Sequence, residues 1–349
     1  MIKNALFALL LTLEAMAALG QTPTPILGPL PVRDEFLLSA GYLALTPTGN
    51  DILPRDRWAL DVRVASSNTF AVSSEISEVL VRQKQPSSWR TDSLRQYPGN
   101  VFVVDGEVQR TTVEIRRGVE GGEVFVAIPI FSTTTDGSGK LIEGFHSEFG
   151  LGSDGRSAIA HDRKFVYLRN GQREVVRTWR DQIGLGDVTL GAKYALPPFA
   201  STALAIEVLA ELPTGERSLF GSGSIDAGAI LVASRQLKHS SIFANVGVAR
   251  LGRNANLDIP DRSVFSATVG YGRMMTAATS ATIQITGANS PFRGLSWPEL
   301  GQNSYQIAAG IQHQIDSRQT LHIALIENAL HYRNSADFAV QVGISVRRP

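Results

Sequence analysis

The chain has no cysteine, which excludes disulfide bonds, thiolate metal sites and cysteine nucleophiles. Charge is also scarce: Asp, Glu, Lys and Arg make up 19% of the 349 residues, against roughly a quarter in ordinary soluble domains. The 33 basic and 32 acidic residues nearly cancel, so the formal net charge of +1 provides no field that would attract nucleic acid. A mean hydropathy of +0.01 excludes a bundle of membrane-spanning helices. We therefore expect no nucleic-acid partner.

Long apolar runs are scarce as well, and the one at the N-terminus is short. Residues 1–20 combine a positive charge at Lys3, an apolar run over 5–13 and a small-residue pattern at 18–20. These are the parts of a secretory signal peptide, so we predict that residues 1–20 are removed on export; the alternative is a buried N-terminal helix. Since no later run reaches the ~20 residues of a transmembrane helix, the mature chain 21–349 can enter a membrane only as strands.

The mature chain shows instead an alternation of apolar and polar residues with a period of two. Four clear examples are 203–212, 265–272, 305–312 and 337–347. Successive side chains of a strand point to opposite faces, so each segment would have one apolar face and one polar or small face. Helical spacing would scatter the same apolar residues around the whole axis, so the pattern predicts an all-β protein.

Two architectures fit such strands: a soluble β-sandwich with an apolar interior, and a membrane β-barrel whose apolar face meets lipid. The alternating segments run about 10 to 14 residues, which suits a tilted crossing of ~9–11 residues better than the usual soluble strand of ~5–6. Connections of alternating length are typical of outer-membrane barrels. Here the short turns are 120–122, 197–200, 238–240, 277–280 and 317–319, and the longer connections are 216–221, 254–262, 293–302 and 331–335. We therefore predict a single transmembrane antiparallel β-barrel, with the sandwich as the alternative.

The strand count requires one inference. From residue 107 onward eleven strands can be placed: 107–118, 122–133, 185–196, 202–214, 223–237, 241–253, 263–276, 280–290, 303–316, 320–330 and 335–347. Two more precede them, at 36–47 and 57–68. Because single-chain bacterial barrels have an even number of strands, we expect a further crossing within 69–84 and hence about fourteen strands, or twelve if 36–84 folds differently.

The longest interruption, 134–182, is the segment that we expect to plug or cover the lumen. Apolar residues recur at helical spacing over 140–149, which predicts one or two helical turns there. Asn170-Gly171 is a strong hairpin-turn pair, so 164–179 is predicted to form an extra hairpin.

Four sequence segments resemble known barrels. Residues 184–194 (GLGDVTLGAKY), 212–217 (LPTGER) and 221–226 (GSGSID) resemble a pattern common in Gram-negative outer-membrane barrels, including those of the phenol-degradation meta-pathway. Residues 142–151 (IEGFHSEFGL) narrow the resemblance to a related, functionally uncharacterised proteobacterial family. The resemblance covers most of the mature chain and implies a barrel in the outer membrane.

Glu143, His146 and Glu148 are the candidate polar groups of the 134–182 segment. Glu143 and His146 form a Glu-x-x-His pattern, but di-iron bundles need two such patterns and two further glutamates. We therefore favour polar contacts of the plug over metal binding, and expect no metal or cofactor. Ser147 lies next to His146 without a G-x-S-x-G elbow, so a lipid hydrolase built into the barrel wall is the least favoured function.

Five further charged residues fall on the polar faces of predicted strands, where a barrel would direct them into its lumen: Asp187, Lys193, Glu207, Glu211 and Asp226. Such fixed charges can set the selectivity of a pore. The simpler interpretation, which we favour, is a set of inter-strand ion pairs that brace the barrel.

The sequence thus predicts an exported, monomeric outer-membrane β-barrel of Gram-negative type. Its expected partners are outer-membrane lipid, the insertion machinery during biogenesis and a small-molecule solute. The leading functional hypothesis is a passive channel or binding barrel for small solutes, hydrophobic ones included. The alternatives are a non-transporting envelope scaffold and the hydrolase.

Overall fold

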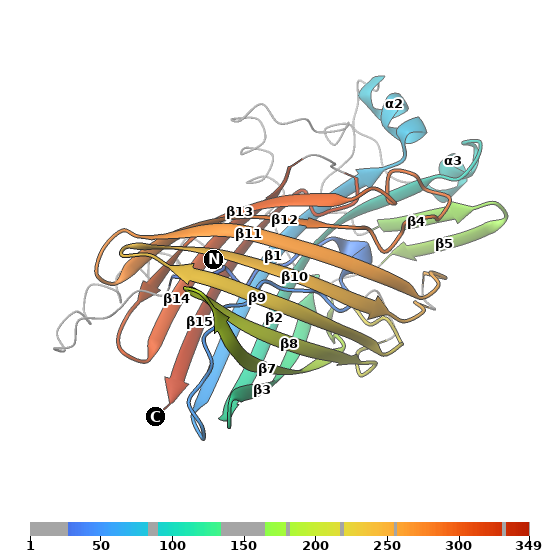
Figure 1. The fold of residues 1–349 in the computed structure, drawn as a ribbon. Helices are drawn as coiled ribbons and strands as arrows, with labels where there is room; N and C mark the ends of the chain where they lie inside the picture. The colour runs from blue at the N-terminus through green and yellow to red at the C-terminus, as the bar shows by residue number, and fades with distance from the viewer. Residues whose placement is uncertain are drawn as a thin grey trace.

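Twelve antiparallel strands close into a single barrel (Figure 1) in the computed structural model, which describes residues 27–82, 90–133, 165–178, 182–216, 220–254, 257–329 and 333–348. Each strand pairs with its neighbours around the wall, and β1 pairs with β15 to join the first strand to the last. The wall consists of β1 (Trp58–Val72), β2 (Phe102–Val119), β3 (Gly122–Ser132), β7 (Val188–Phe199), β8 (Thr202–Leu212), β9 (Asp226–Gln236), β10 (Ser240–Leu251), β11 (Arg262–Met274), β12 (Thr279–Ala288), β13 (Ser304–Gln314), β14 (Gln319–Asn328) and β15 (Phe338–Arg348).

Three shorter strands extend this wall. β4 (Phe165–Asn170) and β5 (Arg173–Thr178) form a hairpin that pairs with the start of β2, and β6 (Ile183–Leu185) pairs with the end of β3. The predicted hairpin around Asn170-Gly171 is therefore confirmed. Gly171 adopts a positive φ of 59°, a backbone conformation that glycine reaches without steric cost.

The described residues form twelve wall strands, the smaller of the two predicted numbers, rather than fourteen. The predicted strand 36–47 is absent: the segment contains only the 3₁₀ turn η1 (Leu37–Ser39) and irregular backbone. Its most apolar residues, 36–38, are consecutive rather than alternating, so they cannot all lie on one face of a strand.

The predicted extra crossing within 69–84 is also absent from the described part of that range, 69–82, because β1 continues to Val72 and the helix α2 (Ser74–Arg82) follows. The buried residues Ile76 and Leu80 of α2 are four apart, which places them on one side of a helix. A second short helix, α3 (Thr91–Arg95), lies in the same connection between β1 and β2.

The two ends of the barrel differ. All five short turns predicted from the sequence connect neighbouring strands at the end where β15 finishes, and the longer connections lie at the opposite end. In Figure 1, α2, α3 and the β4–β5 hairpin lie at the end away from the C-terminus. Outer-membrane barrels keep short turns on the periplasmic side, so we call the short-turn end the periplasmic end and the other the outer end.

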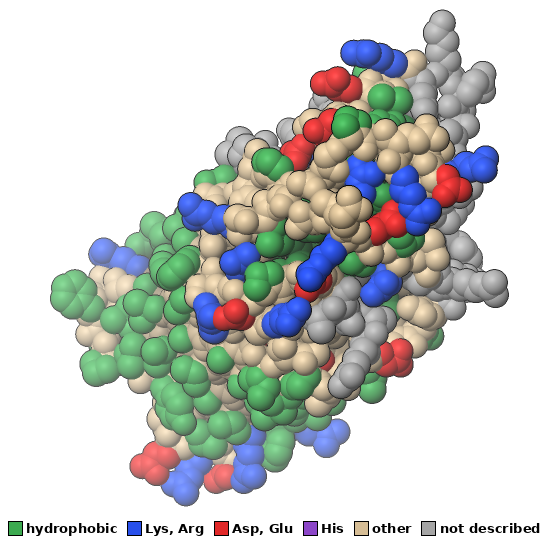
Figure 2. All heavy atoms as spheres, turned by 90° about the vertical axis from the view of Figure 1, so that its right-hand side faces the viewer, with side chains coloured by type: hydrophobic (Ala, Val, Ile, Leu, Met, Phe, Trp, Pro, Cys, Tyr) green, Lys and Arg blue, Asp and Glu red, His purple; other side chains and the backbone are tan. Residues whose placement is uncertain are grey.

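Hydrophobic side chains cover much of the outward face of the wall. Phe265 and Val269 of β11 are 62% and 58% exposed, while Thr268 between them is 2% exposed and faces the lumen. Figure 2 shows hydrophobic side chains gathered over the side of the barrel, with charged side chains at its lower edge. The soluble sandwich is therefore wrong, because a sandwich would bury these apolar residues and expose the polar ones.

Among the described residues, no helix is long and apolar enough to cross a membrane.

Val269→Arg tests the outward face, since residue 269 lies well inside β11. A charged residue facing lipid costs about 2–4 kcal/mol at the bilayer midplane and about 0–1 kcal/mol near the interfaces. We expect Val269→Arg to lower the free energy of unfolding in lipid vesicles by about 2–4 kcal/mol, and Met275→Arg, just beyond the periplasmic end of β11, by less than about 1 kcal/mol. Urea titration measures both values, and equal effects would contradict contact with hydrocarbon at residue 269.

Candidate functional site in the barrel lumen

Residues 27–54, called the plug below, run through the lumen twice. The carbonyl of Leu27 accepts a hydrogen bond from Gln236 at the periplasmic end of β9, and Asp34 accepts one from the backbone N–H of Ala336 at the outer end. The chain then turns through η1 and returns, so that the N–H of Leu53 donates to Glu123 near the periplasmic end of β3. The plug therefore runs along the lumen from the periplasmic end to the outer end and back (blue in Figure 1).

From the sequence we expected the plug in 134–182 instead. Residues 134–164 and 179–181, including Glu143, His146 and Glu148, lie outside the described residues, so their expected role stays a prediction. The described part of that segment forms β4 and β5 at the outer end. Part of the plug that the structure shows, residues 36–47, was predicted from the sequence to be a wall strand.

Amide side chains of the wall hold the ascending arm of the plug, residues 27–36. The Oε1 atom of Gln284 accepts from the N–H of Leu30 at 2.9 Å, and its Nε2 atom donates to the carbonyl of the same residue at 3.2 Å. Gln341 donates to the carbonyl of Pro31, and Gln312 to that of Gly28. Because an amide carries both a donor and an acceptor, it can pair with extended backbone as a neighbouring strand would.

Carboxylate and amide oxygens hold the descending arm, residues 40–54. The N–H of Leu43 donates to Asp226 at 3.0 Å, and the N–H of Thr48 donates to Asn245 at 2.8 Å. The side chain of Asn50 contacts the hydroxyl of Ser234 on β9 at 2.5 Å. Leaving one such buried group unpaired costs about 1–3 kcal/mol, so these wall residues keep the plug in place.

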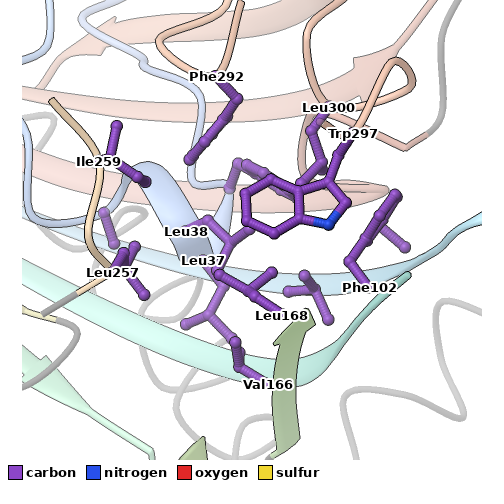
Figure 3. Close-up of a cluster of buried hydrophobic side chains, with 14 of the residues drawn as sticks. Leu37, Leu38, Phe102, Val166, Leu168, Leu257, Ile259, Phe292, Trp297 and Leu300 are labelled. Carbon is purple, nitrogen blue, oxygen red and sulfur yellow. The ribbon is translucent and has the colours of Figure 1, made fainter. Parts of the chain in front are cut away.

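An apolar cluster closes the outer end. Phe36, Leu37 and Leu38 at the turn of the plug pack against side chains from β2, β4 and the connections that follow β10 and β12. Figure 3 shows these side chains converging around the turn; the labelled partners are Phe102, Val166, Leu168, Leu257, Ile259, Phe292, Trp297 and Leu300. The ring of Phe292 meets that of Phe36 edge-on, with centroids 6.1 Å apart. The seal at this end is therefore hydrophobic, whereas the two arms are held by polar groups.

An ion pair and several hydrogen bonds fix the β4–β5 hairpin at the outer end. Arg95 of α3 forms a salt bridge of 2.7 Å with Glu174 of β5, and the hydrogen bond from Arg95 lowers the pKa of Glu174. Arg169 of β4 donates to the backbone carbonyls of Tyr97 and Gly99. These contacts join the connection between β1 and β2 to the hairpin across the outer end.

The five charged residues predicted to line the lumen are all buried there: Asp187, Lys193, Glu207, Glu211 and Asp226. Only Lys193 takes part in a salt bridge among those described, at 3.0 Å from Glu123, and Glu207 lies opposite it in the strand register. Asp187 accepts backbone hydrogen bonds from Gly215 and Ser222, and Asp226 accepts them from Leu43 and Gly252. The aspartates thus hold connections and the plug, while Lys193 joins β7 to β3.

The predictions from the sequence did not include three arginines that lie in the lumen. Arg63 of β1 pairs with Glu114 of β2 at 2.5 Å, and Arg116 pairs with Asp61 at 2.9 Å. Arg110 forms an ion pair with Glu35 of the plug. The available signal was the spacing: Asp61 and Arg63, like Glu114 and Arg116, are two residues apart and so share a strand face.

Two cavities of about 120 Å³ each flank the plug. The charged cavity lies towards β1–β3, β7 and β8, and its lining includes Arg63, Arg110, Glu123 and Glu211. The apolar cavity lies towards β10–β14, and its lining includes Phe36, Leu43, Val264, Phe292 and Ile326. Within the part of the chain that the structure describes, no three His, Asp or Glu residues are grouped to hold a metal ion.

Comparison with known proteins identifies the class and then the family. The barrel resembles the COG4313 outer-membrane channel from Pseudomonas putida F1, with a TM-score of 0.52 and 11% identity over 86% of this chain and 99% of that one. It also matches the NanC porin, with a TM-score of 0.42 and 10% identity over 82% of this chain and 98% of that one. A further match is the CymD monoaromatic hydrocarbon channel, with a TM-score of 0.34 and 12% identity over 84% of this chain and 88% of that one. The fold is that of an outer-membrane β-barrel. Residues 59–347 match DUF3187, described as a protein of unknown function, so the chain belongs to this family. No curated protein matches it.

Gln284→Leu tests how the plug is held, because it removes both hydrogen bonds to Leu30. Each unpaired backbone group costs about 1–3 kcal/mol, so docking of the plug should weaken by at least about 1 kcal/mol, and roughly tenfold more molecules should have it undocked for every 1.4 kcal/mol. The rate of thiol labelling at Ser234→Cys, which the plug covers through Asn50, reports the undocked fraction because the natural chain has no cysteine.

We expect labelling to accelerate at least about fivefold in the Gln284→Leu background, the factor that corresponds to about 1 kcal/mol. The control is Thr286→Val on the same strand, since the hydroxyl of Thr286 bonds Thr268 of β11 rather than the plug. An unchanged labelling rate in Gln284→Leu would mean that these hydrogen bonds do not hold the plug.

Proposed function

We propose that this protein is an outer-membrane channel for small solutes, closed in this structure by its plug and opened when the plug moves. The observation that carries the proposal is that the wall is complete without the plug. The twelve wall strands pair with one another around the whole ring. Each hydrogen bond described above between plug and wall involves a side chain. Moving the plug would therefore leave the barrel's backbone ladder intact.

The size of the barrel supports the same proposal. An eight-stranded barrel is just wide enough for its own side chains to fill it, whereas 16 to 18 strands leave a water channel. Twelve strands lie between these cases, and here the remaining space is occupied by a segment of irregular backbone rather than by wall side chains alone. Displacing that segment would open a passage lined by polar groups.

The proposal includes the finer expectations from the sequence. Residues 1–20 act as a cleaved signal peptide, the insertion machinery places the monomer in the outer membrane, and lipid contacts the outward face. The apolar cavity beside the plug supports passage of small molecules with hydrophobic parts, in keeping with the resemblance to phenol-degradation barrels. The hydrolase alternative depends on His146 and Ser147, which lie outside the described residues, and the scaffold alternative is supported by no particular contact. Neither is proposed.

A disulfide between the plug and the wall tests the proposal. Asn50→Cys with Ser234→Cys places two thiols where the natural side chains touch, in a chain without other cysteines. We expect the reduced double variant to conduct ions in planar bilayers, oxidation to reduce the conductance to background, and a reductant to restore it.

Each single cysteine variant serves as the control and should conduct regardless of oxidant. Equal conductance of the oxidised and reduced double variant would show that ions pass without movement of the plug. Absence of conductance in every form would contradict a channel altogether.

A further inference from the structure

One buried arginine of the wall takes its counter-ion from the plug. The guanidinium of Arg110 on β2 donates to both carboxylate oxygens of Glu35, with Nε 2.9 Å from Oε2. The two side chains are only 11% and 3% exposed. The other basic residues of the wall that line the charged cavity, Arg63, Arg116 and Lys193, pair with wall carboxylates instead. Removing the plug would therefore leave Arg110 without its partner.

The wall also contains a buried carboxylate, that of Glu211, whose charge is opposite to that of Arg110. Glu211 of β8 lies opposite Asp226 in the strand register. Its Oε2 atom accepts a hydrogen bond from Thr189, but its Oε1 atom is buried and has no hydrogen-bond partner. The plug brings a cation to the same cavity, because Arg33 and Glu211 both line it. The guanidinium of Arg33 donates to the backbone carbonyls of Asp34, Ser39 and Tyr42, and it forms no salt bridge with Glu211 among those described.

The plug thus brings the cation of Arg33 to the cavity that Glu211 lines, and it pairs the carboxylate of Glu35 with Arg110. Arg33 and Glu35 are two residues apart in the plug. Arg33, Arg110 and Glu211 all line the charged cavity. A solute that carries both charges can pair with both wall groups when it takes the place of the plug, whereas a singly charged solute leaves one of them unpaired.

We propose that the charged cavity binds small dipolar solutes, which carry a carboxylate for Arg110 and a guanidinium or ammonium group for Glu211. Residues 33–35 of the plug occupy this site as an internal stand-in for the solute. The inference rests on the proposed function, since a bound solute would compete with the plug and favour the open barrel. It names the class of solute, which the fold alone does not.

Thiol labelling of Ser234→Cys tests the competition in the full chain, using four small probes at equal concentration. Guanidinoacetate carries both charges, methylguanidinium only the cation, methanesulfonate only an anion, and methylurea neither. We expect guanidinoacetate to accelerate labelling several-fold and the other three to leave it unchanged. Equal effects of all four, or acceleration by the cation or anion alone, would overturn the proposal.

Variants assign the effect to the two wall groups. Glu211→Gln and Arg110→Gln should each abolish the acceleration by guanidinoacetate, and Arg110→Lys should restore part of it. Glu120→Gln, which alters an exposed carboxylate in the turn between β2 and β3, should retain the full response. A full response in Glu211→Gln would overturn the site. If Ser234→Cys is never labelled, the plug does not move and the channel proposal fails with this one; if it is labelled equally with every probe, only the present inference fails.

Discussion

The structure depends on one constraint: every backbone N–H and C=O group enclosed by the barrel must find a partner. The wall strands meet this requirement by pairing in a closed ring. The plug cannot, because its backbone is irregular, and the wall supplies side chains in place of a neighbouring strand. Gln284 provides both halves of such a pairing to Leu30. The glutamines and carboxylates of the lumen are therefore partners of a particular peptide segment, beyond being a generally hydrophilic lining.

The charges of the lumen divide into two groups by what they hold. Arg63, Arg116 and Lys193 form pairs within the wall and join neighbouring strands. Arg110 instead joins the wall to the plug. These ion pairs lie within the wall, although Lys193 also donates hydrogen bonds to Thr48 and Gly49 of the plug. The Arg110–Glu35 pair matches the charge of the plug to that of the wall around it.

The wall was predictable because its signal is local. A strand with one face towards lipid must alternate, so residues such as Phe265 and Val269 identify β11 without knowledge of any other strand. The same alternation is the reason why the five charged residues were assigned to polar strand faces. The plug was not predictable in this way, because its hydrogen bonds join residues such as Leu43 and Asp226 that are 183 positions apart. Its apolar turn at 36–38 packs against β2, β4 and two connections that are far apart in the chain, and no local period reveals such contacts.

The position of the plug at the start of the sequence has a consequence for how the protein folds. Pro31 is hydrogen-bonded to Gln341, 310 positions later, on the strand that also pairs with β1 to complete the ring. The plug, which precedes every wall strand in the described chain, therefore waits for β15, and the ring must close around it. Contacts so distant in sequence form slowly. Completion of the seam and enclosure of the N-terminal segment thus belong to the same late stage of assembly.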